Sequence, residues 1–585
     1  MASQTGNKVL LAKLVELIEE SHSDLMSRIT SFRKIDEMLR PTIETDNRGV
    51  NKVNLPIAFP MYDTICAELC NILISDPVIK YEGVSPEDAA GVGLLEKVVA
   101  FQCKKNGIAL SLGSLISYAV RYNSCAGLVS WRRSLDNTGN VAFEGSYLAP
   151  IDPYRTLYDP SVPIHRFQDA NYIGWVETIS IAKFLDLIKS GYFDTFKEIE
   201  SVINSPESYR YDTVRGSRRI NGSSTRALDV ITLYVNVIPK AFGLGDSLMP
   251  EKWLFCLLGN HQIIKAVPLG MQHNKYPLVV LAPDYDDFDS TAPSRMGRLS
   301  GLQTLIDWLF STHIKSTTRA TANRIVVDPL GVDLLDVMEN DTFIRVRPSA
   351  AGRDLRTLVQ QLNITDVTAN YYQDIGQTIA VMENISGIDG TQSGQLRKGG
   401  PERLTSSEFA GTLQAAQGRI GKMAQNIAYQ LFPDLGMFFA YNTKNLMTKP
   451  VMVKIAGRWE RELSQMYKNS GGSVLAQAQS LSSTYDVIAY EGSHKNETSA
   501  GTLLEILKLV SANGVLAERF DVECIFKHLL VALGIKDVES FLRVPMENPQ
   551  TQMLGQEQGQ PEQPPVQSQE NRFFNMAEMM NGGGY

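Results

Sequence analysis

Four aspartates lie close together in the segment PDYDDFD and are the residues of this sequence best suited to direct chemistry. They are Asp284, Asp286, Asp287 and Asp289. Gathered around one divalent cation, their hard carboxylate oxygens could activate water in the way that a metal-dependent nuclease requires. However, no lysine or glutamate follows at a spacing typical of such a site, and alternating acids in a Pro-bounded loop are more often a solvated linker. The pattern therefore favours a linker, and no metal is expected.

The motifs of common hydrolases and nucleotide-driven motors are missing from the sequence. Gly421-Lys422 is followed by Met423 in a helical pattern, so it is not a phosphate-binding loop, and neither GxSxG nor HExxH occurs. The six cysteines contain no CxxC pair. Cys66 and Cys70 are four residues apart but lack a second ligand pair, so we expect buried residues rather than zinc ligands. We expect no enzymatic activity and no cofactor.

Charge and hydropathy argue against two further classes of protein. The chain has 56 Lys and Arg residues against 64 Asp and Glu residues, and its net charge of -8 has the wrong sign for general binding of nucleic acid. A weakly acidic surface would suit a conduit, because phosphate does not adhere to it. No run approaches the roughly 18 uncharged apolar residues of a membrane span, so we expect a soluble protein without membrane contact.

Hydrophobic spacing predicts a mixed α+β chain of several domains. Helices are predicted over 9–39 (as one helix or a pair), 62–73, 94–104, 108–121, 405–431, 500–512 and 522–533. Strands are predicted between 126 and 177 and at 230–237, 253–258, 263–267, 278–281, 451–455 and 485–489. The Gln- and Pro-rich segment after Pro545 lacks the apolar content of a core and is predicted to be disordered.

Two long helices bracket a small insertion in the middle of the chain. They are predicted over 299–323 and 364–385, and IRVRP at 344–348 is predicted to be a short strand in a compact α/β insertion. The first helix carries Lys315, Arg319 and Arg324, whereas no Lys or Arg occurs between Arg356 and Arg397. The two helices could pack side by side within a subunit or between neighbours in a ring, or form an ordinary solvated hairpin.

The order of these elements, from about residue 8 to 545, resembles the portal, or head-to-tail connector, family of tailed bacteriophages, particularly the short-tailed type. The opening helix, NKVNLPIAFPMYDTICAELCNIL at 51–73 and the helix leading to ISYAVRYNSCAGLVSW are similar to the family's start. APIDPYRTLYDPSVPIHRFQDANYIGWVETIS at 149–180 is similar to its wing region. In GPERLTSSEF, Arg403, Thr405 and Glu408 match the family's Arg-Thr-Ala-Thr-Glu helix start. The intervening Leu404, Ser406 and Ser407 depart from it.

The resemblance implies a portal fold with a mixed α/β wing, a long helical stem, a small α/β clip and a helical crown. In chain order, the implied domains are the wing (1–298), stem helix 1 (299–324), the clip (325–362), stem helix 2 (363–387), a tunnel loop (388–404), the wing return with a long helix (405–496), the crown (497–545) and a disordered tail (546–585).

The same resemblance implies a structural role. A portal is a ring, usually of twelve subunits, at one vertex of the virion capsid, through which double-stranded DNA is packaged, retained and ejected. The implied partners are further copies of the chain, the terminase large subunit, tail adaptor proteins and the major capsid or scaffold protein, with assembly in the host bacterial cytoplasm. The rival functions are another structural virion protein, such as an adaptor, and a nuclease using the loop at 284–289.

The resemblance also implies roles for three groups of charged residues. Acidic residues of the second stem helix would line the channel and keep phosphate from adhering: Asp366, Asp374 and Glu383. Arg397 and Lys398 on the tunnel loop would make weak, salt-sensitive contacts with DNA, or are merely exposed loop cations. Clip arginines would dock the packaging motor and a tail adaptor, or pair with acids of the adjacent subunit: Arg345, Arg347, Arg353 and Arg356.

Overall fold

The fold is described from a computed structural model. It describes residues 2–46, 49–74, 77–83, 89–194, 227–259, 262–288, 290–321, 324–335, 345–362, 370–388, 406–454, 473–476, 485–488 and 498–512, together with 522, 525–526 and 529–530. The chain divides into two compact units, Met1–Asn496 and Glu497–Tyr585. Helices and strands are mixed in the first unit, which confirms the α+β class. Among the described helices, none combines the length and apolar content of a membrane span.

The N-terminal part of the chain is helical, as predicted. Its helices are α1 (Ala2–Met38), α2 (Ala58–Leu73), α3 (Ala89–Asn106) and α4 (Ile108–Tyr122). α1 is one continuous helix of 37 residues. Between α3 and α4, Gly107 has a φ of +63°, a left-handed conformation that glycine adopts without strain and that lets two helices follow each other directly. A hairpin of β1 (Thr42–Asp46) and β2 (Gly49–Asn54), which the sequence analysis did not predict, follows α1.

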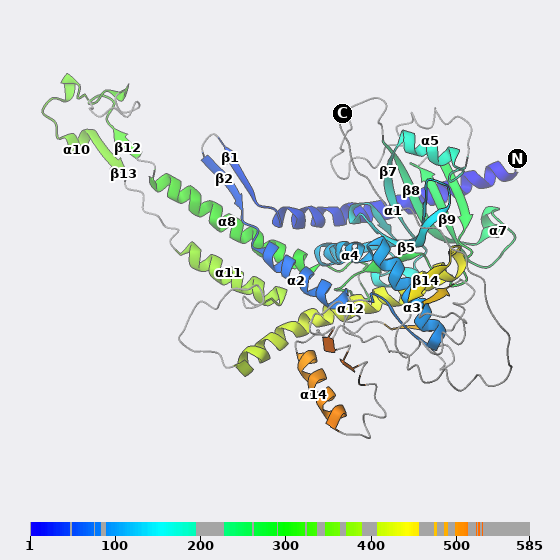
Figure 1. Cartoon of the computed structure of the whole chain (residues 1–585). Helices are drawn as coiled ribbons and strands as arrows, with labels where there is room; N and C mark the ends of the chain where they lie inside the picture. Colours follow the sequence, from blue (N-terminus) through cyan, green and yellow to red (C-terminus); the bar gives the residue numbers. More distant parts are fainter. Residues whose placement is uncertain are drawn as a thin grey trace, which may run out of the picture. The chain divides into compact units, whose positions relative to one another are not determined.

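Two antiparallel sheets hold the strands predicted between 126 and 281 (Figure 1). The three-stranded sheet has the order β11-β4-β5, with β4 (Cys125–Leu135), β5 (Val141–Ile151) and β11 (Leu278–Leu281). The five-stranded sheet has the order β10-β9-β8-β7-β6, with β6 (Thr156–Tyr158), β7 (Tyr172–Ser180), β8 (Ala227–Val237), β9 (Glu251–Leu258) and β10 (Gln262–Pro268).

Both faces of the five-stranded sheet are covered. On one face, Ile231 and Leu233 of β8 share a buried cluster with the apolar stripe of α1. On the other, Val230 packs with Phe184 of α5 (Ile181–Lys189), a short helix missed by the sequence analysis. Alternating side chains of one strand point to opposite faces, so both helices are needed to bury the strand. The strands also approach closely: a Cβ added at Gly174 of β7 would lie 2.3 Å from the carbonyl oxygen of Thr232.

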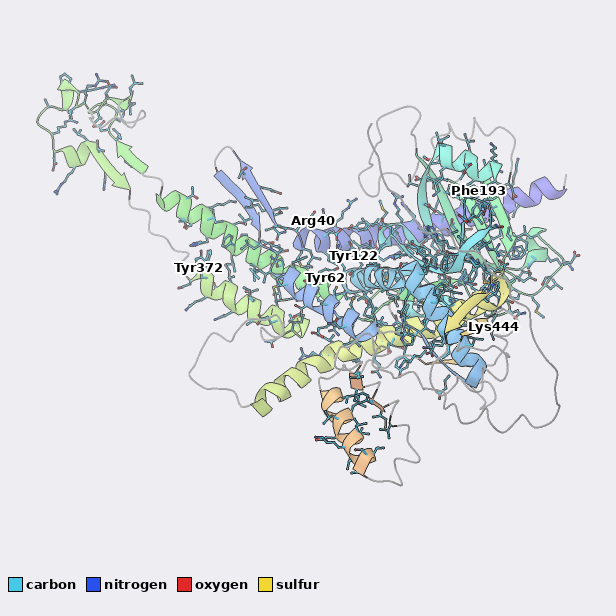
Figure 2. The ribbon with its side chains drawn as sticks, in the orientation of Figure 1. Arg40, Tyr62, Tyr122, Phe193, Tyr372 and Lys444 are labelled. Atoms are coloured by element: carbon cyan, nitrogen blue, oxygen red, sulfur yellow. The ribbon has the colours of Figure 1, made fainter. Side chains whose placement is uncertain are left out.

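A polar cluster anchors α1 to α4. The Asp36 carboxylate accepts hydrogen bonds from the hydroxyl groups of Tyr122 (2.6 Å) and Tyr154 (2.8 Å), and Arg121 lies 3.6 Å away. The guanidinium group of Arg121 also lies over the ring of Tyr62 of α2, and Figure 2 labels both tyrosines, Tyr62 and Tyr122, near each other. Burial raises the pKa of Tyr122 and Tyr154. Both phenols therefore stay protonated at neutral pH and remain donors to Asp36.

The largest buried cluster joins the N-terminal helices to later parts of the chain, including two long helices. These are α8 (Arg295–Thr321) and α12 (Ser406–Leu446). α8 confirms the first predicted long helix and begins four residues earlier. α12 has 41 residues and continues past Pro433, beyond the predicted end at 431. Proline removes one helical hydrogen bond, but Leu435, Phe438 and Phe439 stay buried in the cluster and hold the next turns.

The predicted insertion between the long helices is present, but its strands are not where the sequence analysis placed them. A two-stranded sheet pairs β12 (Arg324–Val327) with β13 (Val359–Leu362). Arg324 therefore belongs to a strand rather than to the first long helix. Within IRVRP the described residues form only the isolated bridge between Val332 and Val346, and a 3-10 helix (Pro348–Ala350) follows. A four-residue helix, α10 (Leu355–Leu358), precedes β13.

The second long helix and the remaining strands complete the first unit. α11 (Tyr371–Ser386) has 16 residues, and the predicted start at 364 lies outside the described residues. Two more pairs join β14 (Val451–Lys454) to β15 (Ser473–Ala476), and β16 (Tyr485–Ile488) to β3 (Lys80–Gly83). β14 and β16 confirm predicted strands. Three short elements lie in the connections between these strands and helices: the 3-10 helices Pro153–Arg155 and Ile164–Asp169, and α7 (Pro239–Phe242).

The second unit contains α14 (Thr498–Ala512), which confirms the helix predicted over 500–512. Of the helix predicted over 522–533, the five described residues are helical. The tail after Pro545 lies outside the described residues.

Candidate functional site

α8 and α11 lie side by side, as Figure 1 shows. Along α11, Ile375, Ile379 and Met382 recur at spacings of four and three and pack into the main core, so this face of the helix is buried. Toward the insertion, the ring of His313 on α8 meets Tyr372 edge to face at 4.8 Å. Figure 2 labels Tyr372 at this end of α11. The two helices thus pair within one subunit, with the small insertion between them in sequence.

The acidic residues of α11 lie on different sides of the helix. Asp374 is exposed and Glu383 is half-buried. Nine residues separate them, which corresponds to about 180° around a helix of 3.6 residues per turn. The exposed face between them carries the neutral amides Gln373, Gln377 and Asn384. Within the described part of the chain, neither acid forms an ion pair. Asp366, the third predicted acid, lies outside the described residues.

A cation from another helix binds a backbone carbonyl group at the C-terminal end of α11. Arg419 of α12 donates a hydrogen bond of 2.8 Å from Nη1 to the carbonyl oxygen of Asn384. A positive charge at a helix C-terminus stabilises it through the helix dipole. The sequence analysis missed this residue because the contact spans 35 positions and carries no local pattern. The predicted tunnel-loop cations Arg397 and Lys398 lie outside the described residues.

The four arginines predicted to dock partners all belong to the insertion and are exposed: Arg345, Arg347, Arg353 and Arg356. Arg347 lies 3.9 Å from Asp333, and Arg353 lies 3.8 Å from Asp328. Exposed pairs at such distances contribute little to stability. The insertion has a small core of its own, Val332, Ala350 and Leu358. A Cβ added at Gly331 would lie 2.5 Å from a Leu358 methyl group.

The aspartate loop that could have formed a metal site is engaged in structural contacts instead. Asp284 pairs with Arg295 at 3.4 Å, and Asp287 lies 2.9 Å from His165. Asp286 accepts a hydrogen bond from the backbone N–H of Phe288. Asp289 lies outside the described residues. Among the residues that the structure describes, no group of three or more potential ligands is placed to hold a metal ion.

The two cysteines of α2 fit the expectation of packing residues. Cys66 is buried in the main core, and Cys70 is partly buried beside it. Burial raises the pKa of the Cys66 thiol to about 11 and also raises that of Cys70. A thiol binds metal as the thiolate. Protonation at neutral pH therefore disfavours a metal site here.

Comparison with known proteins supplies the family. A family model described as Phage SU10 portal protein matches residues 140–580, well over half of the chain. The match begins at the end of the turn between β4 and β5 and includes α8, the insertion, α11 and α12. A search of curated proteins finds no match.

Proposed function

The chain belongs to the family of the phage SU10 portal protein, and from this premise we propose that it is the subunit of a ring channel, usually of twelve copies, at one vertex of a phage capsid. Double-stranded DNA would pass through this channel during packaging and ejection. The single observation that carries the proposal is the family match across the α8–insertion–α11 segment. The pairing of α8 with α11 supports it, because two packed helices form a rigid strut from which a ring wall can be built.

We assign the exposed face of α11 to the channel wall. Gln373, Gln377 and Asn384 present neutral amides, and Asp374 and Glu383 flank them. No Lys or Arg occurs on this helix. Because phosphate binding depends on cations, such a face lets a duplex slide without adhering. Asp366, which precedes α11 in the chain, would extend the same acidic lining.

The cations have two separate roles in this proposal. Arg397 and Lys398, in the segment between α11 and α12, would touch phosphate and hold packed DNA through weak, salt-sensitive contacts. The insertion would be the clip, where exposed arginines dock the terminase large subunit and later the tail adaptor proteins. Contacts with the major capsid or scaffold protein would fix the ring in the virion, after assembly in the host bacterial cytoplasm.

Electron microscopy of the purified full-length protein tests the ring. We expect closed rings with a central hole and a uniform subunit count in negative stain. Mass photometry should give a single dominant mass near the same multiple of the 64.9 kDa chain. Monomers alone, at concentrations well above micromolar and at several salt concentrations, would contradict the proposal.

DNA retention tests the assigned cations. Particles assembled with Arg397→Glu and Lys398→Glu should package DNA but lose it faster than wild type, and the difference should shrink at high salt because exposed charges are screened. Lys240→Glu, at an exposed position of α7, is the matched control for a lysine-to-glutamate change. Equal DNA retention by the double variant and wild type at low salt would remove the assigned role.

A further inference from the structure

A groove with a volume of about 690 Å³ lies on α8. Its floor is a helical stripe with spacings of three and four: Gly301, Thr304, Trp308, Ser311 and Lys315. The last part of α1 and the β1–β2 hairpin form its walls. Ser311 and Lys315 are each two residues away from His313, whose ring contacts Tyr372 of α11. Two residues correspond to about 200° around a helix. The floor around Ser311 and Lys315 therefore faces away from the His313 contact with α11.

The hairpin wall is held to α8 by hydrogen bonds. The backbone N–H of Val53 donates to the Ser311 hydroxyl group at 3.0 Å. The backbone N–H of Leu55 donates to the Asp307 carboxylate at 3.1 Å, and the Gln303 side chain donates to the Leu55 carbonyl oxygen. Three residues of α8 thus fix the edge of the groove. A preformed groove binds its occupant without a cost for ordering it.

The floor combines an exposed aromatic ring with small residues and a cation. Trp308 is 58 % exposed, which is unusual for so large a side chain. Lys315 follows it seven residues later, two turns further along the same side. Within the described residues, Lys315 forms no ion pair, and neither do the wall lysines Lys34 and Lys52. The acids Glu37 and Glu44 also line the walls. The groove therefore fits a helix whose surface is apolar with an acid facing Lys315.

Within the part of the chain that the structure describes, one helix has such a surface, and its apolar residues there stay exposed. On α11, Asp374, Val381 and Ile385 lie on one side of the helix at spacings of seven and four. Val381 is 47 % and Ile385 46 % exposed. This side is distinct from the one buried within the subunit, which carries Ile375, Ile379 and Met382.

We propose that the groove of each subunit receives α11 of the neighbouring subunit, an inference that rests on the ring of the proposed function. Val381 and Ile385 pack against Trp308 and the small floor residues, and Asp374 pairs with Lys315. α8 then holds its own α11 on one side and the neighbour's on the other. Such a heterologous contact repeats from copy to copy and closes into a ring.

The positions of the residues along the axes of the two helices agree with this arrangement. α11 runs back along α8 (Figure 1), and His313 contacts Tyr372. Counting away from this contact in both helices sets Val381 level with Thr304 and Asp374 level with Ser311. Lys315 lies four residues, about 6 Å, from that level, a distance that its long side chain can span. In a ring whose axis is parallel to the helices, rotation from one copy to the next leaves each residue's position along that axis unchanged. Residues at the same level on α8 and α11 can therefore meet between neighbouring copies.

Cross-linking tests the contact in assembled rings. A double variant with Thr304→Cys and Val381→Cys is treated with a short bismaleimide. We expect a ladder of covalent oligomers on denaturing gels. Each single variant gives the background from the native cysteines, of which Cys66, Cys103, Cys125 and Cys256 are buried. The control pair, Val381→Cys with Lys240→Cys on α7, should give no ladder above this background.

Charge reversal tests the ion pair independently. Lys315→Glu should raise the protein concentration for half-assembly by about tenfold, which corresponds to about 1.4 kcal/mol. Adding Asp374→Lys to the same chain should restore assembly, whereas Lys240→Glu should leave it unchanged. If the wild type forms rings, but the cysteine pair gives no ladder and Lys315→Glu leaves assembly unchanged, this contact is overturned and the portal function still stands. Absence of rings in the wild type would overturn the proposed function itself.

Discussion

The five-stranded sheet and the α8–α11 pair bury their apolar residues to different degrees. Sheet residues such as Ile231, Leu233 and Phe255 are fully buried, because α1 covers one face and α5 the other. On the helical pair, Trp308 and Tyr372 are each 58 % exposed. Contiguous exposed apolar residues usually mark an interaction surface. The comparison shows that the sheet buries its apolar residues within one chain, whereas the helical pair leaves part of its apolar surface exposed, as the proposed contact with a second copy requires.

Truncation in the sheet should have the largest effect on the folded subunit. Phe255→Ala removes a ring that is 0 % exposed and packs beside Trp253 at a centroid distance of 6.1 Å. The cavity should lower the free energy of unfolding by about 3–5 kcal/mol, measured by urea denaturation. Phe288→Ala is the matched control, because Phe288 is 100 % exposed. Equal losses in the two variants would mean that the sheet is not a self-sufficient core.

The same contrast explains which elements could be predicted from the sequence. The helices α2, α3, α4 and α8 and the strands β4, β5 and β7 to β11 were predicted because their apolar residues form the patterns expected of buried helices and strands. The three-residue strand β6 was not predicted. The β1–β2 hairpin was missed because Val53 is its only buried apolar residue among those described. Of the strand predicted within IRVRP, the described residues form only the isolated bridge of Val346 with Val332, and Val346 is 41 % exposed, so little apolar burial extends the pairing.

Sites formed by distant segments could not be predicted at all. The groove joins Lys34, Lys52 and Trp308, which lie on α1, β2 and α8 and share no local pattern. The contact of Arg419 with the end of α11 is of the same kind. The aspartate loop shows the reverse: its residues are neighbours in sequence, but Asp284 and Asp287 pair with Arg295 and His165. Sequence proximity raised the possibility of a metal site, which the sequence analysis already disfavoured relative to a linker.

Substitution of one buried carboxylate, Glu144, should lower the free energy of unfolding less than Phe255→Ala does, and by an amount that depends on pH. Glu144 of β5 accepts hydrogen bonds from Thr448 and Lys449 after α12 and from Arg133 of β4. Burial alone would raise its pKa, but the backbone N–H groups of Lys449 and Thr448 outweigh this, so the pKa is lowered. Glu144→Gln should cost about 1–3 kcal/mol of unfolding free energy at pH 7.

The sign of the pH dependence follows from the lowered pKa. The ionised carboxylate stabilises the folded state fully above the ordinary glutamate pKa of about 4.3, and this stability is lost as the pH falls through the lower folded value. The difference between wild type and Glu144→Gln in urea denaturation should therefore shrink below about pH 4. Glu177→Gln, at an exposed pair with Lys183, is the control and should change little at either pH. A difference independent of pH would contradict ionisation of Glu144.

The smallest effect on the isolated subunit is expected at Trp308. In dissociated subunits, Trp308→Ala should lower the unfolding free energy by at most about 1 kcal/mol, because the ring has only a distant stacking partner in Tyr371, with centroids 6.5 Å apart. The matched variant is Trp253→Ala, whose ring is only 7 % exposed, and it should lose about 3–5 kcal/mol. Ring assembly should reverse this order: at concentrations where both subunits are folded, Trp308→Ala should impair assembly more than Trp253→Ala. If Trp308→Ala instead unfolds the isolated subunit as readily as Trp253→Ala, then α8 belongs to a self-contained core. The contrast between the sheet and the helical pair would then fail.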